Sequence, residues 1–370
     1  MLKYSLAIFL ITTSAAFAQE PGKLHPPKLT PQQSGTTQLL ISVSPVNESV
    51  VWAAGTGGTY VVTTDGGEHW KSAVVPGAEN EQFRDVHGVS DKVAYLMSIG
   101  NDTTDFRVYK TIDGGAHWTI QFMNEDPLAF YDCFAFWTPD RGITHSDSGN
   151  GVFPDIRTKN GNTWESIAAK MPPALPGEAS FAASGTCIAA QGETNAWITT
   201  GGSTIARILA TGDGGNTWNA YDTPLVSSPS AGGISVAFRD SRHGIVGGGD
   251  LNSNTSSDTA TSDDGGRTWN LTNAPPVQGA IFCLAYIRGT ERGDDQGRRS
   301  GEEFGHFDRT VVITTETEPD FSSGEAAFTP DEGITWVPIP GASGYWAVAF
   351  ANPHAGWFVG NNGQILKISF

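Results

Sequence analysis

Thr63-Thr-Asp65-Gly-Gly67-Glu-His-Trp70 and Thr111-Ile-Asp113-Gly-Gly115-Ala-His-Trp118 are two copies of one octapeptide. Three more full copies and a version one residue shorter, with Asn in place of Asp, occur later in the chain. They are Thr158-Lys-Asn160-Gly-Asn-Thr163-Trp164, Thr211-Gly-Asp213-Gly-Gly215-Asn-Thr217-Trp218, Ser262-Asp-Asp264-Gly-Gly266-Arg-Thr268-Trp269 and Thr329-Pro-Asp331-Glu-Gly333-Ile-Thr335-Trp336. The six tryptophans stand 48, 46, 54, 51 and 67 residues apart, a period typical of the four-stranded blades of a propeller.

The chemistry of the octapeptide is that of a turn between two strands. Aspartate can accept hydrogen bonds from nearby backbone N–H groups, and glycine reaches positive φ without a steric penalty. We interpret the aspartates as structural, because five full copies cannot all be active sites of one domain. The residues predicted to build the turns and anchor the next strand are Asp65 and Trp70, Asp113 and Trp118, Asn160 and Trp164, Asp213 and Trp218, Asp264 and Trp269, and Asp331 and Trp336.

Between the octapeptides a second pattern recurs, as in Ser235-Val-Ala-Phe238 and Ala347-Val-Ala-Phe350. It predicts the innermost strand of each blade. Seven such strands are expected, near residues 39–44, 82–87, 131–137, 185–190, 233–238, 280–286 and 345–350. The last unit has no octapeptide and no fourth strand, so we expect the Pro-rich segment 19–37 to supply that strand and close the ring. The sequence therefore predicts an all-β fold, a single seven-bladed β-propeller of four-stranded antiparallel blades over residues 38–370.

The octapeptide resembles the Asp-box, or BNR repeat, of sialidases, sortilin-type receptors and related propellers. Phrases such as Ala347-Val-Ala-Phe-Ala-Asn-Pro-His-Ala-Gly-Trp357 extend the likeness. Nearly all of residues 38–370 is similar to the photosystem II stability/assembly factor-like branch of these propellers. The resemblance implies an exported, non-catalytic assembly factor that binds a membrane-protein precursor.

Composition and charge narrow the classes of function. The 370 residues are 38% hydrophobic and 16% charged, which suits a chain that buries a core. The formal charge of −17 argues against binding to nucleic acid or an anionic membrane. Residues 1–18 have the pattern of a signal peptide, with Lys3, a short apolar stretch and Ala16-Phe17-Ala18 before the cleavage point. We expect a secreted or periplasmic protein that begins at Gln19 and has no transmembrane segment.

The mouth of the propeller, on the face opposite the octapeptides, is the default ligand site. Asp85 and Asp132 come from similar places on adjacent blades, and a pair of carboxyl groups is what glycoside hydrolysis requires. The interpretation that we favour is that each carboxylate pairs with an arginine or caps a turn. The candidate binding residues of the mouth are Arg84, Asp85, Tyr131, Asp132, Tyr345 and Trp346.

Cys133, Cys187 and Cys283 each begin a Cys-x-Ala motif on a predicted inner strand. An odd number of cysteines in a large chain argues against a disulfide scaffold. Converging inner strands leave little volume, so we expect these residues to be small packing residues and Cys133→Ser to leave the fold intact. No Cys-x-x-Cys motif or zinc-ligand spacing occurs, and we expect no metal and no cofactor.

Residues 288–309 depart from the repeat as a Gly-rich insertion of mixed charge in blade 6. We expect a solvated loop there, with partner docking as the alternative. Two hypotheses for function follow. The first is a monomeric, non-catalytic module that recognises a protein partner of the cell envelope over the mouth. The second is a carbohydrate-active propeller, either a glycoside hydrolase or a glycan-binding lectin, that uses acidic and aromatic residues of the mouth.

Overall fold

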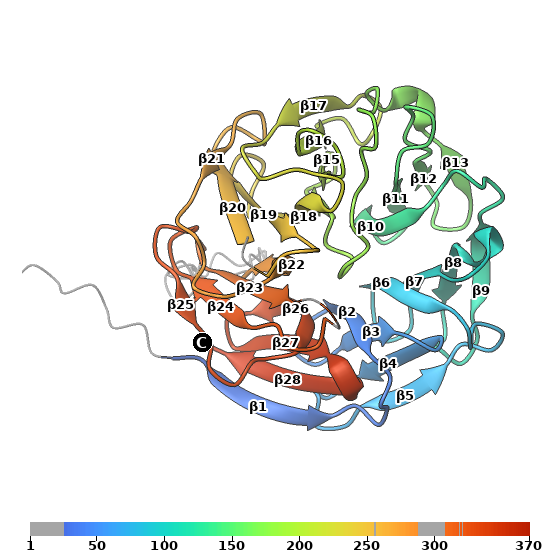
Figure 1. Cartoon of the computed structure of the whole chain (residues 1–370). Coiled ribbons are helices and arrows are strands. Elements are labelled where there is room, and N and C mark those ends of the chain that lie inside the picture. The colour runs from blue at the N-terminus through green and yellow to red at the C-terminus, as the bar shows by residue number, and fades with distance from the viewer. Residues whose placement is uncertain (1–25, 255–256, 288–307, 318, 320) are drawn as a thin grey trace, which may run out of the picture.

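The computed structural model describes residues 26–254, 257–287, 308–317, 319 and 321–370. Their strands form seven four-stranded antiparallel sheets, arranged as a ring around a central axis (Figure 1). The predicted seven-bladed β-propeller is therefore confirmed. The predicted signal peptide and nearly all of the 288–309 insertion lie outside the described residues.

The first four blades follow the chain in order, each from its inner to its outer strand. Blade 1 is β2 (Leu40–Pro45), β3 (Val51–Gly55), β4 (Thr59–Thr63) and β5 (Lys71–Val74). Blade 2 is β6 (Gln82–Gly88), β7 (Ala94–Ile99), β8 (Arg107–Thr111) and β9 (Thr119–Met123). Blade 3 is β10 (Tyr131–Thr138), β11 (Arg141–Ser146), β12 (Ile156–Thr158) and β13 (Trp164–Ser166). Blade 4 is β14 (Ile188–Gln191), β15 (Asn195–Thr199), β16 (Arg207–Thr211) and β17 (Asn219–Asp222).

The last three blades complete the ring, and the N-terminal strand closes it. Blade 5 is β18 (Ala231–Phe238), β19 (Gly244–Asp250), β20 (Ser257–Ser262) and β21 (Asn270–Leu271). Blade 6 is β22 (Ala280–Tyr286), β23 (Val311–Glu316), β24 (Ala326–Thr329) and β25 (Val337–Pro338). Blade 7 is β26 (Tyr345–Asn352), β27 (Ala355–Gly360), β28 (Gln364–Ser369) and β1 (Lys28–Gln33). Short 3-10 helices occur at η1 (Thr103–Asp105), η2 (Ala168–Lys170) and η4 (Asn361–Gly363).

The closing strand β1 lies antiparallel to β28, from Lys28 opposite Ser369 to Gln33 opposite Gln364. This pairing confirms the expectation that the segment before Gln38 completes the last blade. It also covers the edge of β28, so that the two ends of the chain are held together. The apolar residues between neighbouring sheets form separate clusters around the ring rather than one central core.

The octapeptide turns share one hydrogen-bond pattern. In blade 4, the Thr211 hydroxyl donates to Asp213 Oδ1 (2.9 Å) and accepts from the N–H of Gly215 (3.1 Å). The Asp213 carboxylate then accepts from the backbone N–H (2.9 Å) and the hydroxyl (2.7 Å) of Thr217. Asp65, Asp113, Asp264 and Asp331 each accept from the backbone N–H four residues later at 2.7–3.0 Å. These hydrogen bonds support the structural interpretation of the repeated aspartates.

Each of five turns is also held by a donor from the preceding blade, which bonds a glycine carbonyl of the turn. Tyr60 Oη donates to the carbonyl of Gly115 (2.6 Å), and Trp197 Nε1 donates to that of Gly265 (2.8 Å). The remaining three pairs are Lys367 to Gly66, Lys110 to Gly161 and Arg157 to Gly215. The turns therefore connect blades as well as strands.

The turn of blade 6 is different because Glu332 stands where the other full copies have glycine. Its φ is +57°, a left-handed conformation that costs energy for a residue with a Cβ. The carboxylate compensates by binding Arg239 Nε (2.7 Å) of blade 5, together with Arg309 Nε (3.0 Å) and Tyr286 Oη (2.9 Å). A charged contact at this junction thus takes the place of the hydrogen bond to a glycine carbonyl.

Candidate functional site

Six of the seven inner strands contain a bulge at the same position. The register slips by one residue between Phe83 and Asp85 in β6 and between Tyr131 and Cys133 in β10. The same slip occurs in β2, β18, β22 and β26. The residues at the bulge are Ile41, Arg84, Asp132, Ile234, Phe282 and Trp346. Bulges re-aim side chains, and here they place one residue from each of these blades at a common level.

Most of these bulge residues close the centre of the ring. Ile41, Ile234, Phe282 and Trp346 belong to one buried apolar cluster although they come from four blades. The rings of Phe282 and Trp346 meet edge to face at 5.1 Å. At this level the centre of the ring is therefore filled by buried apolar side chains, which form the floor of the mouth.

The predicted site residues divide into two sets that face different ways. Arg84, Asp132 and Trp346 are bulge residues at the central level, whereas Asp85, Tyr131 and Tyr345 are their neighbours in sequence. Successive residues of a strand point to opposite faces, and Tyr131 accordingly donates its hydroxyl to the carbonyl of Pro154 (3.1 Å) within blade 3. Tyr345 packs against Phe358 of β27 at 5.5 Å. Neither tyrosine joins the central cluster.

Arg84 is the cation of the central level. Its Nη1 donates to the carbonyl of Ala182 (2.9 Å), its Nη2 donates to Gln82 Oε1 (2.8 Å), and its guanidinium lies 5.9 Å from the Trp346 ring. Burial lowers the pKa of Arg84 to about 10, against an opposing effect from the Asp132 carboxylate. Even so the guanidinium stays charged at neutral pH and orients the segment that contains Ala182.

Asp132 is 1% exposed and pairs with the carboxyl group of Asp147. Burial raises the pKa of Asp132 well above its usual range, and the nearby Asp147 and Asp155 carboxylates raise it further. Burial also raises the pKa of Asp147, although the hydrogen bonds from the backbone N–H of Ser180 (2.9 Å) and from Asp132 act against that rise. Two adjacent buried carboxyl groups do not ionise independently, so Asp132 and Asp147 titrate as one coupled pair.

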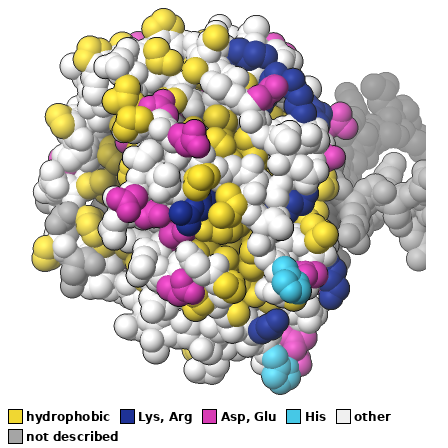
Figure 2. All heavy atoms as spheres, turned by 90° about the vertical axis from the view of Figure 1, so that its right-hand side faces the viewer, with side chains coloured by type: hydrophobic (Ala, Val, Ile, Leu, Met, Phe, Trp, Pro, Cys, Tyr) yellow, Lys and Arg dark blue, Asp and Glu magenta, His cyan; other side chains and the backbone are white. Residues whose placement is uncertain are grey.

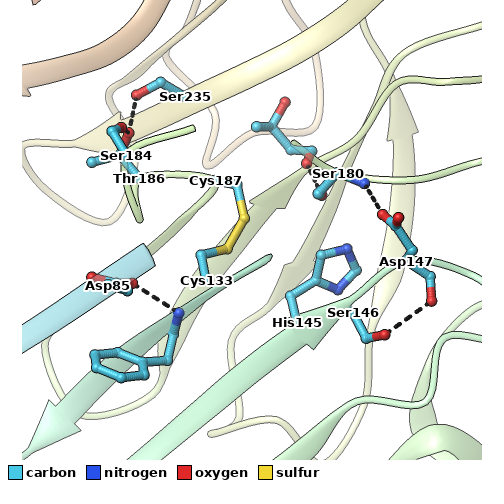
Figure 3. The surroundings of a disulfide bond; sticks show 12 residues. Asp85, Cys133, His145, Ser146, Asp147, Ser180, Ser184, Thr186, Cys187 and Ser235 are labelled. Atoms are coloured by element: carbon cyan, nitrogen blue, oxygen red, sulfur yellow. Dashed lines mark hydrogen bonds between the residues drawn. A yellow bond between two sulfur atoms is a disulfide. The ribbon is translucent and has the colours of Figure 1, made fainter. Parts of the chain in front are cut away.

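A segment of blade 4, residues 179–187, crosses the mouth, and we call it the strap. Ser180 bonds Asp147 of blade 3, the carbonyl of Ala182 accepts from Arg84 of blade 2, and Ser184 Oγ donates to the carbonyl of Phe282 of blade 6 (2.6 Å). Figure 3 shows Ser180, Ser184 and Thr186 of the strap around its anchor at Cys187. The strap thus contacts blades on several sides of the axis.

Cys187 at the end of the strap forms a disulfide with Cys133 of β10 (Figure 3). The expectation that these two cysteines are only small packing residues is wrong. They are 54 residues apart, but the ring places their Cα atoms 6.0 Å apart, within the range that a disulfide needs. Cys283 is a buried free thiol, as the odd cysteine count requires.

Asp85 occupies the same position in blade 2 that Cys133 occupies in blade 3, namely the residue after the bulge. Its Oδ2 accepts from the N–H of Phe134 in blade 3 (2.9 Å), and its Oδ1 accepts from the N–H of Val86 (2.8 Å). Burial raises the pKa of Asp85 well above its usual range. Asp85 and Asp132 are thus not equivalent residues of adjacent blades: one joins two blades and the other lies at the centre.

Four partly exposed apolar residues surround the floor, and we call them the rim: Leu39, Phe181, Leu251 and Phe321. Phe321 has a φ of +50°, which is a strained conformation for a bulky residue. Its carbonyl accepts from Trp346 Nε1 (3.1 Å), which fixes it over the floor. The rim could not be predicted from the repeat, because its members come from loops between the strands.

Three cavities lined by described residues lie away from the floor. One of about 640 Å³ follows β1 and the start of β28 and includes Tyr345. Cavities of about 350 and 210 Å³ lie in the grooves between blades 4 and 5 and between blades 3 and 4, beside the octapeptide turns. Within the described residues, one group of side chains has the geometry to hold a metal ion, the exposed Asp65, Glu68 and His69. Within the same residues, no helix is long and apolar enough to span a membrane.

A scan against protein-family models finds no match, and a search of curated proteins finds none either. Among solved structures the chain is similar to "YCF48 bound to D1 peptide", with a TM-score of 0.61, 17% identity and coverage of 94% of this chain and 98% of that one. It is also similar to YCF48 from Cyanidioschyzon merolae (TM-score 0.59, 15% identity, coverage 92% and 98%). A GH74 xyloglucanase from Xanthomonas campestris has a TM-score of 0.56 and 13% identity, and this chain covers 53% of that enzyme's length. At these identities the likeness shows the fold, a seven-bladed β-propeller, with a peptide-bound protein and a glycoside hydrolase among its structural neighbours.

Proposed function

We propose that this chain is an exported, non-catalytic propeller that binds an extended segment of a cell-envelope protein across the mouth. The observation that supports this proposal most directly is the apolar rim of Leu39, Phe181, Leu251 and Phe321 above the floor. An apolar floor with apolar residues around it suits the side chains of an extended peptide.

The strained backbone of Phe321 adds a second argument. Bulky residues rarely keep a positive φ unless the surroundings enforce it, and such residues gather at ligand-binding sites. A structural neighbour whose name records a bound peptide agrees with this proposal. The likeness of residues 38–370 to the photosystem II stability/assembly factor-like propellers also favours this proposal, whereas the octapeptide alone is shared with sialidases.

Hydrolysis of a glycosidic bond receives less support from the site. Asp85 is 6% exposed with both carboxylate oxygens bonded to backbone N–H groups, and Asp132 is 1% exposed beneath the strap. A general acid or nucleophile must touch its substrate, and neither carboxyl group lies at the surface.

The test is an affinity pull-down of residues 19–370 from the native envelope extract, with mass-spectrometric identification of what is recovered. We expect one protein partner, and we expect recovery to fall about tenfold when Leu39 and Leu251 are both changed to Ser, since each loses buried apolar area. The matched control is Ile112→Ser, because Ile112 is 72% exposed in an octapeptide turn on the other face. Equal recovery with the rim variant would overturn the proposal, and recovery of glycan in place of protein would favour the carbohydrate-active alternative.

A further inference from the structure

The groove between blades 3 and 4 contains the 210 Å³ cavity beside the octapeptide turn of blade 4. Its wall from blade 3 is Trp137, Arg141, Arg157, Thr158 and Lys159, and its wall from blade 4 is Gly214 and Asn216. Trp137 is fixed, because its Nε1 donates to the carbonyl of Asn195 (2.7 Å). The cavity therefore combines a rigid aromatic side chain with three cations.

The cations of this groove exceed its acids. Arg157 and Lys159 both bind the Glu165 carboxylate, at 2.9 and 2.8 Å. Lys170 Nζ approaches Asn216 Oδ1 (3.3 Å) from the edge of the groove. Within the described residues, neither Arg141 nor Lys170 has a carboxylate within salt-bridge distance.

Arg141 is the cation with the most unused capacity. A single 3.4 Å contact joins its Nη2 to the carbonyl of Glu193, although a guanidinium has five N–H donors. Two acids close to Arg141 in sequence or in the facing turn have other partners: Asp140 accepts from Thr138, and Asp213 accepts from Thr217. Figure 2 shows Lys and Arg side chains gathered at the upper right of the face over β8, β9 and β13.

We propose that this groove binds a small ligand bearing an oxyanion, a carboxylate, phosphate or sulfate group, held by Arg141 with Lys159 and Lys170. An arginine fork beside lysine matches the oxygens of such a group, and the volume admits one compact anion with a small organic body. The volume of about 210 Å³ limits the ligand to a small molecule, and the formal charge of −17 disfavours a long polyanion.

The equivalent groove between blades 4 and 5 provides the contrast. It is larger, about 350 Å³, and is lined by Arg242, Arg267 and the acidic Asp264. Arg242 donates to the carbonyl of Asp263, and Arg267 donates to that of Asp264. Arg267 is held within its own turn, and Arg242 reaches the neighbouring turn of the same blade. The lining of this groove includes the acidic Asp264, whereas the residues that line the 210 Å³ cavity include no acid.

The test is titration of residues 19–370 with phosphate, sulfate and glucuronate at constant ionic strength, with glucose as the neutral control. The indole N–H signal of Trp137 in NMR spectra locates binding, calorimetry measures the affinity, and the three anions distinguish inorganic from sugar-borne oxyanions. We expect Arg141→Gln to weaken binding at least about tenfold and Arg242→Gln to leave it within about twofold.

Glu165→Gln is the second variant, because it removes the carboxylate that competes for Lys159. We expect it to strengthen binding about threefold or more, an effect that damage to the fold would not produce. No shift of the Trp137 signal with any anion, or equal binding by wild type and Arg141→Gln, would overturn the proposal.

Discussion

Two layers of contact join the blades, an inner ring at the bulges and an outer ring at the octapeptide turns. In the outer ring the turn offers a glycine carbonyl, and the preceding blade supplies a donor that differs from junction to junction. In the inner ring the bulge offers a backbone N–H, and the preceding blade supplies an acceptor that also differs. The inner pairs are Asp85 with Phe134, Ser235 with Leu284 and Cys283 with Val348.

In both rings the backbone group that takes part in the hydrogen bond is the same from blade to blade. The side chain of the preceding blade that bonds to it differs from one junction to the next. Cys133 and Cys283 occupy the same inner position, yet Cys283 accepts an N–H at 3.4 Å and Cys133 forms a covalent bond. The difference lies in the next blade, which presents Cys187 to one and Ala347 to the other. The same residue type is thus a weak acceptor at one junction and half of a disulfide at another.

Breaking the covalent junction is expected to have the largest effect. Cys133→Ser should keep the fold but reduce the free energy of unfolding by about 2–4 kcal/mol, because the disulfide closes a long loop in the unfolded chain. Urea unfolding of wild type and variant, each with and without reductant, measures this. Reductant should lower the wild-type midpoint to that of the variant and leave the variant unchanged.

Cys283→Ser is the control for this experiment, since it changes a cysteine at the same position of another blade without removing a disulfide. We expect a loss of about 1 kcal/mol or less, because serine can still accept the N–H of Val348. If Cys133→Ser and Cys283→Ser lost the same free energy of unfolding, and reductant did not change the wild-type midpoint, the Cys133–Cys187 disulfide would not stabilise the inner ring.

The ion pair between Glu332 and Arg239 is the charged contact of the outer ring, and a substitution of Glu332 tests it. Glu332→Gln should reduce the free energy of unfolding by about 1–2 kcal/mol at neutral pH, because Arg239 loses a partner that is only 10% exposed. Burial acts to raise the pKa of Glu332, but the bonds from Arg239, Arg309 and Tyr286 outweigh it and lower the pKa.

The sign of the pH effect follows from that lowered pKa. The extra free energy of unfolding of the wild type over Glu332→Gln should be complete above the pKa of glutamate in the unfolded chain, about 4.3. It should fade as the pH drops through the lower pKa of Glu332 in the folded protein. Thermal unfolding of both proteins over this range measures the difference. A difference between the two proteins that is independent of pH would contradict the charged contact.

The sequence predicted the outer ring well and the inner ring poorly, for a physical reason. The turn needs Asp and Gly in fixed places, so its chemistry is visible as a repeat, and the closing strand follows from a missing fourth strand. The inner acceptors can be Asp, Ser or Cys, so no motif marks them, and the contact of Cys133 with Cys187 needs the ring geometry. The bulge also hid the true alignment, in which Asp85 matches Cys133 and Asp132 matches Arg84.

The candidate sites were less predictable than the fold. Arg84, Asp132 and Trp346 were expected among the binding residues of the mouth, and that role stays a prediction. The strap that contacts Arg84 and Asp147 begins outside any strand, so no sequence pattern indicated it. The rim residues are single apolar residues in loops, which no spacing distinguishes from ordinary loop residues. The oxyanion groove combines residues of two blades, and its excess of cations appears only when the fold of blade 3 brings Arg141 of β11 close to Lys159 beside the turn of blade 4.

The smallest effect is expected within the outer ring, where Asn160 already occupies the place of aspartate in blade 3. Its Oδ1 accepts the N–H of Thr163 (3.0 Å), so an amide can keep the backbone contacts of the turn. Asp213→Asn should therefore reduce the free energy of unfolding by less than about 1 kcal/mol at neutral pH, since the exposed carboxylate is screened by solvent.

The pH dependence of this turn follows from the pKa of Asp213. Desolvation of Asp213 is outweighed by the Thr217 and Thr211 hydrogen bonds, which lower its pKa to about 2. The contribution of the ionised Asp213 carboxylate to the free energy of unfolding is complete above the pKa of aspartate in the unfolded chain, about 3.9. It is lost as the pH falls toward the lower pKa of Asp213 in the folded protein. The difference in unfolding temperature between wild type and Asp213→Asn should accordingly narrow in acid, and Asn160→Asp should acquire the same acid sensitivity. A difference that stays constant down to about pH 2 would mean that the turn depends on the shape of the side chain and not on its charge.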